Sequence, residues 1–84
     1  MNLPDLPNIG PVLAGNLERI CVDSPESLRL LGAEEAWLRI RRDVDPGACF
    51  HQLQALAGAV AGVHKKDLPP ERKAALKAFF NSHR

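Results

Sequence analysis

The sequence predicts an all-α protein, a compact bundle of five short helices. Apolar residues recur at spacings of three and four along most of the 84 residues, which is the period of a half-buried helix. Strand signals are poor, because the chain has three phenylalanines, one tryptophan, no tyrosine and few β-branched residues in alternation. Proline or glycine separates the apolar segments, so we expect tight turns between the helices.

The first helix should begin at Pro11. Proline suits the first helical position, because the N–H that it lacks would be unpaired there in any case. Leu13, Leu17 and Ile20 then fall on one face of the helix. Ala14 widens that face, which we expect to be buried.

The second helix has a clear start and end. Ser24 is the expected N-cap and Pro25 the first helical residue. Leu28 and Leu31 should face inward. Gly32 should end the helix, since glycine is favoured just beyond the last helical residue.

A third helix is expected over residues 33–43. Its first turn holds two glutamates and its end holds arginines, which complements the helix dipole. Glu35 and Arg39 are also spaced for an ion pair on the helix surface. The alternative is that the arginines contribute to a phosphate track. The apolar stripe of this helix consists of Ala36, Trp37 and Ile40.

The fourth helix is expected to begin at Asp45 and Pro46, a cap followed by a first-turn proline. Gly58 within it costs about 1 kcal/mol relative to alanine, so we expect another helix to approach closely there. Gly62 is a plausible end. The buried face is predicted to contain Phe50, Leu53, Ala57 and Val60, with Leu56 and Ala61 beside it.

The last helix should follow Pro69 and Pro70 and run through Leu76, Phe79 and Phe80. Two adjacent helical residues cannot both point to the core, so at least one phenylalanine should be only partly buried. Residues 81–84 are expected to fray.

Residues 1–84 are predicted to form a single domain with a core over about 3–80. Formal net charge is +1, lower than is usual for a dedicated nucleic-acid binder. No stretch is apolar enough for a membrane span, and the N-terminus does not read as a signal peptide, so we expect a cytoplasmic protein. Cys21 and Cys49 are expected to be reduced and buried, although spacing alone leaves a disulfide open.

Residues 6–14 resemble a helix-hairpin-helix motif, in which a short turn leads directly into a helix. Ile9 should plug into the core while Gly10 allows a sharp turn. The next helix would then direct backbone amides outward, toward a phosphate. Asn8 stands where the motif has its first glycine; asparagine tolerates a positive φ, so the turn should survive. Val12 stands where a lysine is frequent. The turn is therefore a plain connector, a DNA-backbone contact or a protein contact.

The second half of the chain echoes this pattern. A helix over residues 53–62, a turn over 64–69 and a helix over 71–80 would form a second hairpin unit. A connecting helix that contains Trp37 would join the two units in a SAM-like arrangement. Lys65 and Lys66 lie in the second turn, and Arg72, Lys73 and Lys77 could extend a basic track, which nearby acidic residues interrupt. The candidate nucleic-acid or partner contacts are Asn8, Ile9, Gly10, Val12, Lys65 and Lys66.

Taken whole, the chain resembles the C-terminal domain of the TfoX (Sxy) family. Four blocks carry the resemblance and span most of residues 3–80: Leu6–Pro11, Leu30–Ala36, Leu53–Gly58 and Asp67–Arg72. The family is named for regulators of natural competence, which are two-domain proteins that act with a cyclic-AMP-responsive transcription factor. Only their C-terminal half is similar to this chain.

The resemblance implies a non-enzymatic regulatory domain in bacterial transcription or DNA uptake, acting on a protein partner such as the transcription machinery. The alternative is weak, sequence-independent DNA binding. Catalysis ranks third, because no nucleophile and base occur together. The histidines and cysteines lack zinc spacing, and no phosphate-binding loop motif occurs, so we expect neither metal nor cofactor. The sequence does not indicate an oligomeric state.

Overall fold

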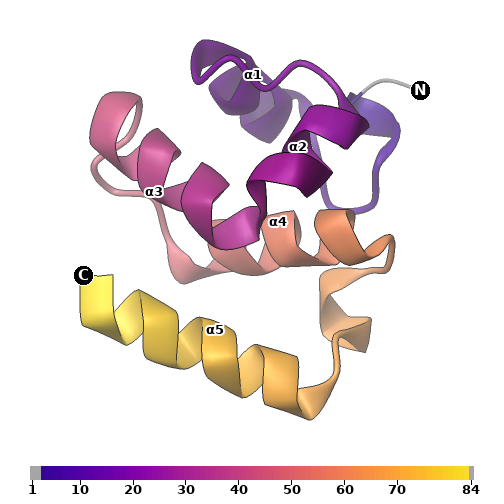
Figure 1. Ribbon diagram of the computed structural model, residues 1–84, viewed down its shortest axis with the longest axis vertical. Coiled ribbons are helices and arrows are strands. Elements are labelled where there is room, and N and C mark those ends of the chain that lie inside the picture. Colours follow the sequence, from indigo (N-terminus) through magenta and orange to yellow (C-terminus); the bar gives the residue numbers. More distant parts are fainter. Residues whose placement is uncertain (1–2, 84) are drawn as a thin grey trace.

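Helices account for every regular element in the part of the chain that the computed structural model describes, residues 3–83. This part of the chain forms five α-helices, whose apolar side chains share one core; Figure 1 shows how the helices are arranged. This confirms the predicted all-α class. In chain order the elements are η1 (Leu3–Asp5), α1 (Pro11–Arg19), α2 (Pro25–Leu31), α3 (Ala33–Asp43), α4 (Phe50–Ala61), η2 (Lys65–Asp67) and α5 (Pro70–His83), where η denotes a 3-10 helix.

The starts of α1 and α2 follow their local sequence signals. Pro11 is the first residue of α1 and Pro25 the first residue of α2. The Ser24 hydroxyl caps α2 by accepting a hydrogen bond from the backbone N–H of Ser27 at 3.1 Å. Leu28 is fully buried, whereas Leu31 is only half-buried at the margin of the core. Both predicted N-termini are therefore confirmed.

Helix α3 lies at the centre of the packing. Its stripe of Ala36, Trp37 and Ile40 is completely buried, as predicted. The indole Nε1 of Trp37 donates a hydrogen bond to the backbone carbonyl of Cys49 at 3.2 Å. A buried tryptophan N–H needs such an acceptor, because an unpaired donor in the core is costly. This contact anchors the segment that precedes α4.

The predicted start of α4 is wrong. Asp45 does not cap a helix; its carboxylate accepts a hydrogen bond from the Gly47 backbone N–H at 2.9 Å and closes a local turn. The helix begins only at Phe50, and Cys49 is its N-cap residue. An aspartate followed by proline suits a turn as well as a cap. The tertiary position of Trp37 favours the turn, since that side chain holds the Cys49 carbonyl.

Helix α4 is buried along most of its length. Leu53, Leu56 and Ala57 lie in the core, whereas Phe50 and Val60 are half-buried and Ala61 is exposed. The helix ends as predicted at Gly62, which is left-handed with φ of 76°.

Helix α5 runs along the outer side of α4, with which it is in contact (Figure 1). Leu76 is fully buried, and both phenylalanines are half-buried, as expected for adjacent helical positions. The rings of Phe79 and Phe80 lie 6.0 and 5.5 Å from the Trp37 ring. Fraying over residues 81–83 was wrongly predicted, because the helix continues to His83, whose ring packs on Phe79 at 4.2 Å. Arg84 lies outside the described residues.

The two cysteines contradict the expectation of burial. Cys21 and Cys49 are both exposed and both free thiols. Cys21 lies in the turn after α1 with φ of 67°, a left-handed conformation that directs its side chain away from the core. Among the described residues, no helix is long and apolar enough to cross a membrane.

Candidate functional site

The loop between η1 and α1 has the tight geometry that the hairpin pattern predicts. The Leu6 N–H donates to the Leu3 carbonyl at 3.0 Å, and the Ile9 N–H donates to the Leu6 carbonyl at 3.3 Å. These bonds turn the chain so that Ile9 enters the core, where it is 4% exposed. The two predicted hairpin units differ in their first helix. In the first unit it is the three-residue 3-10 helix η1, whereas in the second unit it is the complete helix α4.

The predicted role of Gly10 in the turn is wrong. Gly10 has an ordinary extended backbone with φ of −90°. Asn8 instead adopts the left-handed conformation, with φ of 71°. Asparagine accepts this region more readily than most residues, so it fulfils the role that the motif gives to its first glycine.

Asn8 joins the two candidate turns. Its side-chain Nδ2 donates to the Val63 carbonyl at 3.0 Å, and its Oδ1 accepts from the Lys65 backbone N–H at 3.1 Å. Both ends of one amide are therefore used to bind the turn before α5. The structure thus brings together two site residues that lie far apart in the sequence, Asn8 and Lys65.

Gly58 of α4 lies beneath this junction. A side chain there would come closest to Asn8 Nδ2, and a Cβ would lie 2.8 Å from the Val63 carbonyl oxygen and 3.1 Å from the Lys65 Cα. The close approach predicted for Gly58 is real, but it comes from the Asn8 loop and from the turn that leads into the short 3-10 helix η2, and not from another α-helix. Only glycine leaves room for the Asn8 amide to reach its partners.

The turn that carries the lysines is ordered by its own hydrogen bonds. His64 Nδ1 accepts from the Lys66 backbone N–H at 3.3 Å and caps η2. Lys73 Nζ donates to the Lys66 carbonyl at 2.8 Å and ties the turn to α5. Lys66 is exposed and Lys65 is half-buried. An ordered turn with one exposed lysine, Lys66, therefore lies beside the Asn8 loop.

Val12 is the exposed apolar member of the candidate site. It is 78% exposed in the first turn of α1. Pro11 beside it supplies no N–H, so one potential anion donor of this helix end is missing. The site therefore offers an apolar side chain where a phosphate-binding hairpin would present a cation.

The wider basic track predicted as an alternative is neutralised at Arg72. Arg72 donates two hydrogen bonds to the Glu34 carboxylate, at 2.6 and 2.8 Å. These bonds hold the pKa of the Glu34 carboxyl below its ordinary value, despite the opposing effect of partial burial. Arg72 thereby links the start of α3 to the start of α5 and has little charge left for a ligand.

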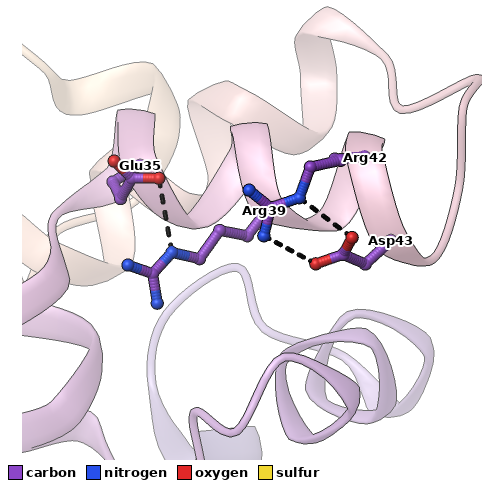
Figure 2. A network of polar contacts seen from close by, with 4 residues as sticks. All are labelled: Glu35, Arg39, Arg42 and Asp43. Atoms are coloured by element: carbon purple, nitrogen blue, oxygen red, sulfur yellow. Dashed lines mark hydrogen bonds and ion pairs between the residues drawn. The ribbon is translucent and has the colours of Figure 1, made fainter.

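Acidic neighbours also bind the arginines of α3. Figure 2 shows Glu35 with Arg39 and Asp43 with Arg42 along this helix. The Arg39 Nε lies 3.3 Å from Glu35, which confirms the predicted pair. Arg42 donates twice to Asp43, at 2.9 and 2.8 Å, and these bonds lower the pKa of the Asp43 carboxyl. The guanidinium of Arg41 lies 5.6 Å from the Trp37 ring centroid.

Residues 3–83 contain no group of three or more histidine, cysteine or acidic side chains that could hold a metal ion. The sequence did not predict the ion pair of Glu34 with Arg72 or the two side-chain hydrogen bonds of Asn8, because no local sequence pattern indicates contacts between distant segments. It also missed the exposure of Leu30. That signal was present, since Leu28 and Leu30 fall on opposite sides of a helix.

Known proteins are similar to this chain in both sequence and fold. The chain matches the TfoX C-terminal domain over residues 1–80. It is 34% identical over 80 residues to Protein Sxy of Escherichia coli strain K12; the match covers 95% of this chain and 38% of that relative. The chain therefore spans about two fifths of the length of the curated relative it matches.

Two crystal structures from Listeria monocytogenes have the same fold. One is a triclinic form of an uncharacterized protein, 40% identical, with a TM-score of 0.95 over 98% of this chain and 92% of that chain. The other is a tetragonal form of a protein of unknown function, also 40% identical with a TM-score of 0.95, covering 99% and 100% of the two chains. Sequence and architecture thus agree along nearly the whole length, and the chain belongs to the TfoX C-terminal domain family.

Proposed function

We propose that this domain is a non-enzymatic interaction module of a competence-type regulator, and that it binds a protein partner through the Asn8 junction. We define the Asn8 junction as the surface of residues 8–12 together with Lys65 and Lys66. Membership in the TfoX C-terminal domain family supports the regulatory role.

One observation carries the choice of a protein partner: the Val12 side chain is 78% exposed in the first turn of α1, directly after the ordered Asn8 turn. An exposed apolar side chain beside a fixed polar rim suits a protein contact. Arg39, Arg42 and Arg72 are paired with acidic neighbours, which weakens the positive field that would attract a polyanion.

Sequence-independent contact with the DNA backbone is the second candidate. Asn8 holds the Lys65 turn next to the start of α1, so a cation and helix-terminal amides lie on one side of the molecule. Such a site would bind through charge alone. Its affinity should therefore fall steeply with salt, by about 40-fold between 50 and 200 mM for three phosphates.

A titration of labelled duplex DNA at these two salt concentrations separates the candidates, with amide chemical shifts as the readout. For a protein-binding module we expect no shifts at residues 8–13 at either concentration. Shifts that map to this loop, decrease with salt and vanish with Lys65→Glu would establish DNA binding instead. Arg19→Glu is the matched control, because Arg19 is exposed in the last turn of α1, outside the predicted basic track.

The protein contact is tested with a photo-crosslinking amino acid placed at Val12 in the bacterial cell. A discrete adduct is expected at this position. The same amino acid at Ala75, exposed on α5, should give none. Equal adduct patterns at both positions would contradict a specific surface at the Asn8 junction.

A further inference from the structure

Leu30 is the most exposed large apolar side chain among the described residues. It is 90% exposed, even though it lies in α2 between the core residue Leu28 and the half-buried Leu31. At 3.6 residues per turn, burial of Leu28 directs Leu30 outward. Covering an aliphatic side chain as exposed as Leu30 with another surface lowers the free energy, because apolar area is removed from water.

A shallow groove lies beside Leu30. Its lining is mostly apolar, with Ile20 and Val22 nearly buried and Leu31 half-buried; Cys21, Ser27 and Arg39 also line it. Leu30 itself forms one side of the groove. A projecting leucine next to an apolar groove makes a self-complementary surface, which is what a twofold interface between identical copies requires.

The charges of α2 are also arranged self-complementarily. Glu26 lies in its first turn and Arg29 in its last, and both are exposed. Neither forms an ion pair with another residue within 3–83. Two α2 helices packed antiparallel would bring Glu26 of each copy opposite Arg29 of the other, so that two complementary pairs form along the middle of the contact and one Leu30 lies just beyond each Arg29.

We propose that this α2 face is the self-association surface of the domain, with two copies joined by antiparallel α2 helices. The α2 face is formed by Ile20, Val22, Glu26, Arg29, Leu30 and Leu31. It lies outside the Asn8 junction, so a dimer forms whether or not that junction binds a protein. The face has far fewer side chains than the about 20–30 per partner of a standard interface, so the dimer is weak and exchanges quickly.

Sedimentation equilibrium from about 10 μM to 1 mM tests the proposal, using the full chain with a reducing agent to prevent disulfides through the exposed cysteines. We expect a concentration-dependent monomer–dimer equilibrium. Leu30→Asp should weaken it by at least about 10-fold, because a charge would replace the exposed apolar side chain that each copy contributes to the contact. Ala75→Asp is the control: Ala75 is exposed on α5, outside both the α2 face and the Asn8 junction, and the change should leave the dimer intact.

Charge reversal tests the antiparallel orientation. Glu26→Arg alone should weaken the dimer, because only cations would then face one another. Adding Arg29→Glu to the same chain should restore it, since both pairs become complementary again. A chain that stays monomeric at 1 mM, a dimer unaffected by Leu30→Asp, or a double variant as weak as the single one would overturn the proposal.

Discussion

The side-chain amide of Asn8 lies directly over the backbone of Gly58, in the space that a β-carbon would fill. Asn8 belongs to the loop before α1, and Gly58 to the third turn of α4. Their contact lets one amide reach both Val63 and Lys65. The shape of the candidate site therefore depends on a residue that is itself buried beneath it.

Gly58→Ala is expected to destabilise the domain by about 1–3 kcal/mol, because the added methyl group overpacks the junction. This loss opposes the gain of about 1 kcal/mol that alanine normally brings to a helix interior. Urea unfolding followed by Trp37 fluorescence measures the change. Gly15→Ala is the control, since a β-carbon at Gly15 in α1 meets nothing within 4 Å. It should be neutral or stabilising, and a similar loss in both variants would contradict the steric explanation.

Asn8→Ala should cost about 2–4 kcal/mol. The change removes both side-chain hydrogen bonds and leaves an alanine in a left-handed conformation. Asn8→Gly loses the same bonds without the backbone strain, so it should be milder by about 1 kcal/mol. Thermal unfolding compares the two. Equal losses of stability in Asn8→Ala and Asn8→Gly would contradict the expectation that the left-handed backbone at this position strains the alanine variant.

Ile9→Asp should destabilise the domain by about 3 kcal/mol or more, because an unpaired carboxylate would enter the core. Val12→Asp introduces the same charge three residues later, at an exposed position, and should stay near the wild-type stability. Chemical denaturation of both variants is the measurement. An unchanged midpoint for Ile9→Asp would mean that the loop is not packed as described.

The pair of Glu34 and Arg72 should make stability depend on acid pH. Unfolded, the Glu34 carboxyl titrates near its ordinary pKa of 4.5; folded, its pKa is lower. The unfolded state therefore binds the proton more tightly, so the contribution is complete above about pH 4.5 and is lost as pH falls through the folded pKa. Because both side chains are 35% exposed, we expect about 0.5–1 kcal/mol at neutral pH.

Unfolding of Glu34→Gln and the wild type from pH 7 to pH 3 checks this dependence. The difference in free energy of unfolding should shrink as pH falls. Glu35→Gln is the control, since its pair with Arg39 is more exposed and longer, at 3.3 Å. A constant difference between Glu34→Gln and the wild type across the range would show that the carboxylate charge does not stabilise the fold.

Local signals predicted most of the helices because their causes are local. The prolines at the starts of α1 and α2, the Ser24 cap and the glycine at the end of α4 act within a few residues, and the structure confirms each. The predicted start of α4 is wrong because its cause is not local. Asp45 and Pro46 satisfy the rules for a cap and for a turn alike, and the hydrogen bond from Trp37 to Cys49 lies outside any local window.

The candidate site was predicted in part for similar reasons. Burial of Ile9 and exposure of Val12 follow from the apolar pattern around them. The positive φ that asparagine tolerates is confirmed at Asn8, whereas Gly10, which is expected to allow the sharp turn, has an extended backbone. An asparagine side chain can hydrogen-bond anywhere within reach, so its partners could not be inferred from its neighbours in sequence.

The sequence by itself determined the helical class, the helix starts marked by proline and serine, the buried stripe of α3 and the family. These properties depend on residue order, periodicity and short-range hydrogen bonds. Only the tertiary structure decided which distant segments meet: Asn8 with the Lys65 turn, Glu34 with Arg72, and the rings of α5 with Trp37. Such contacts depend on how whole helices pack, and that packing is a property of all the apolar faces together.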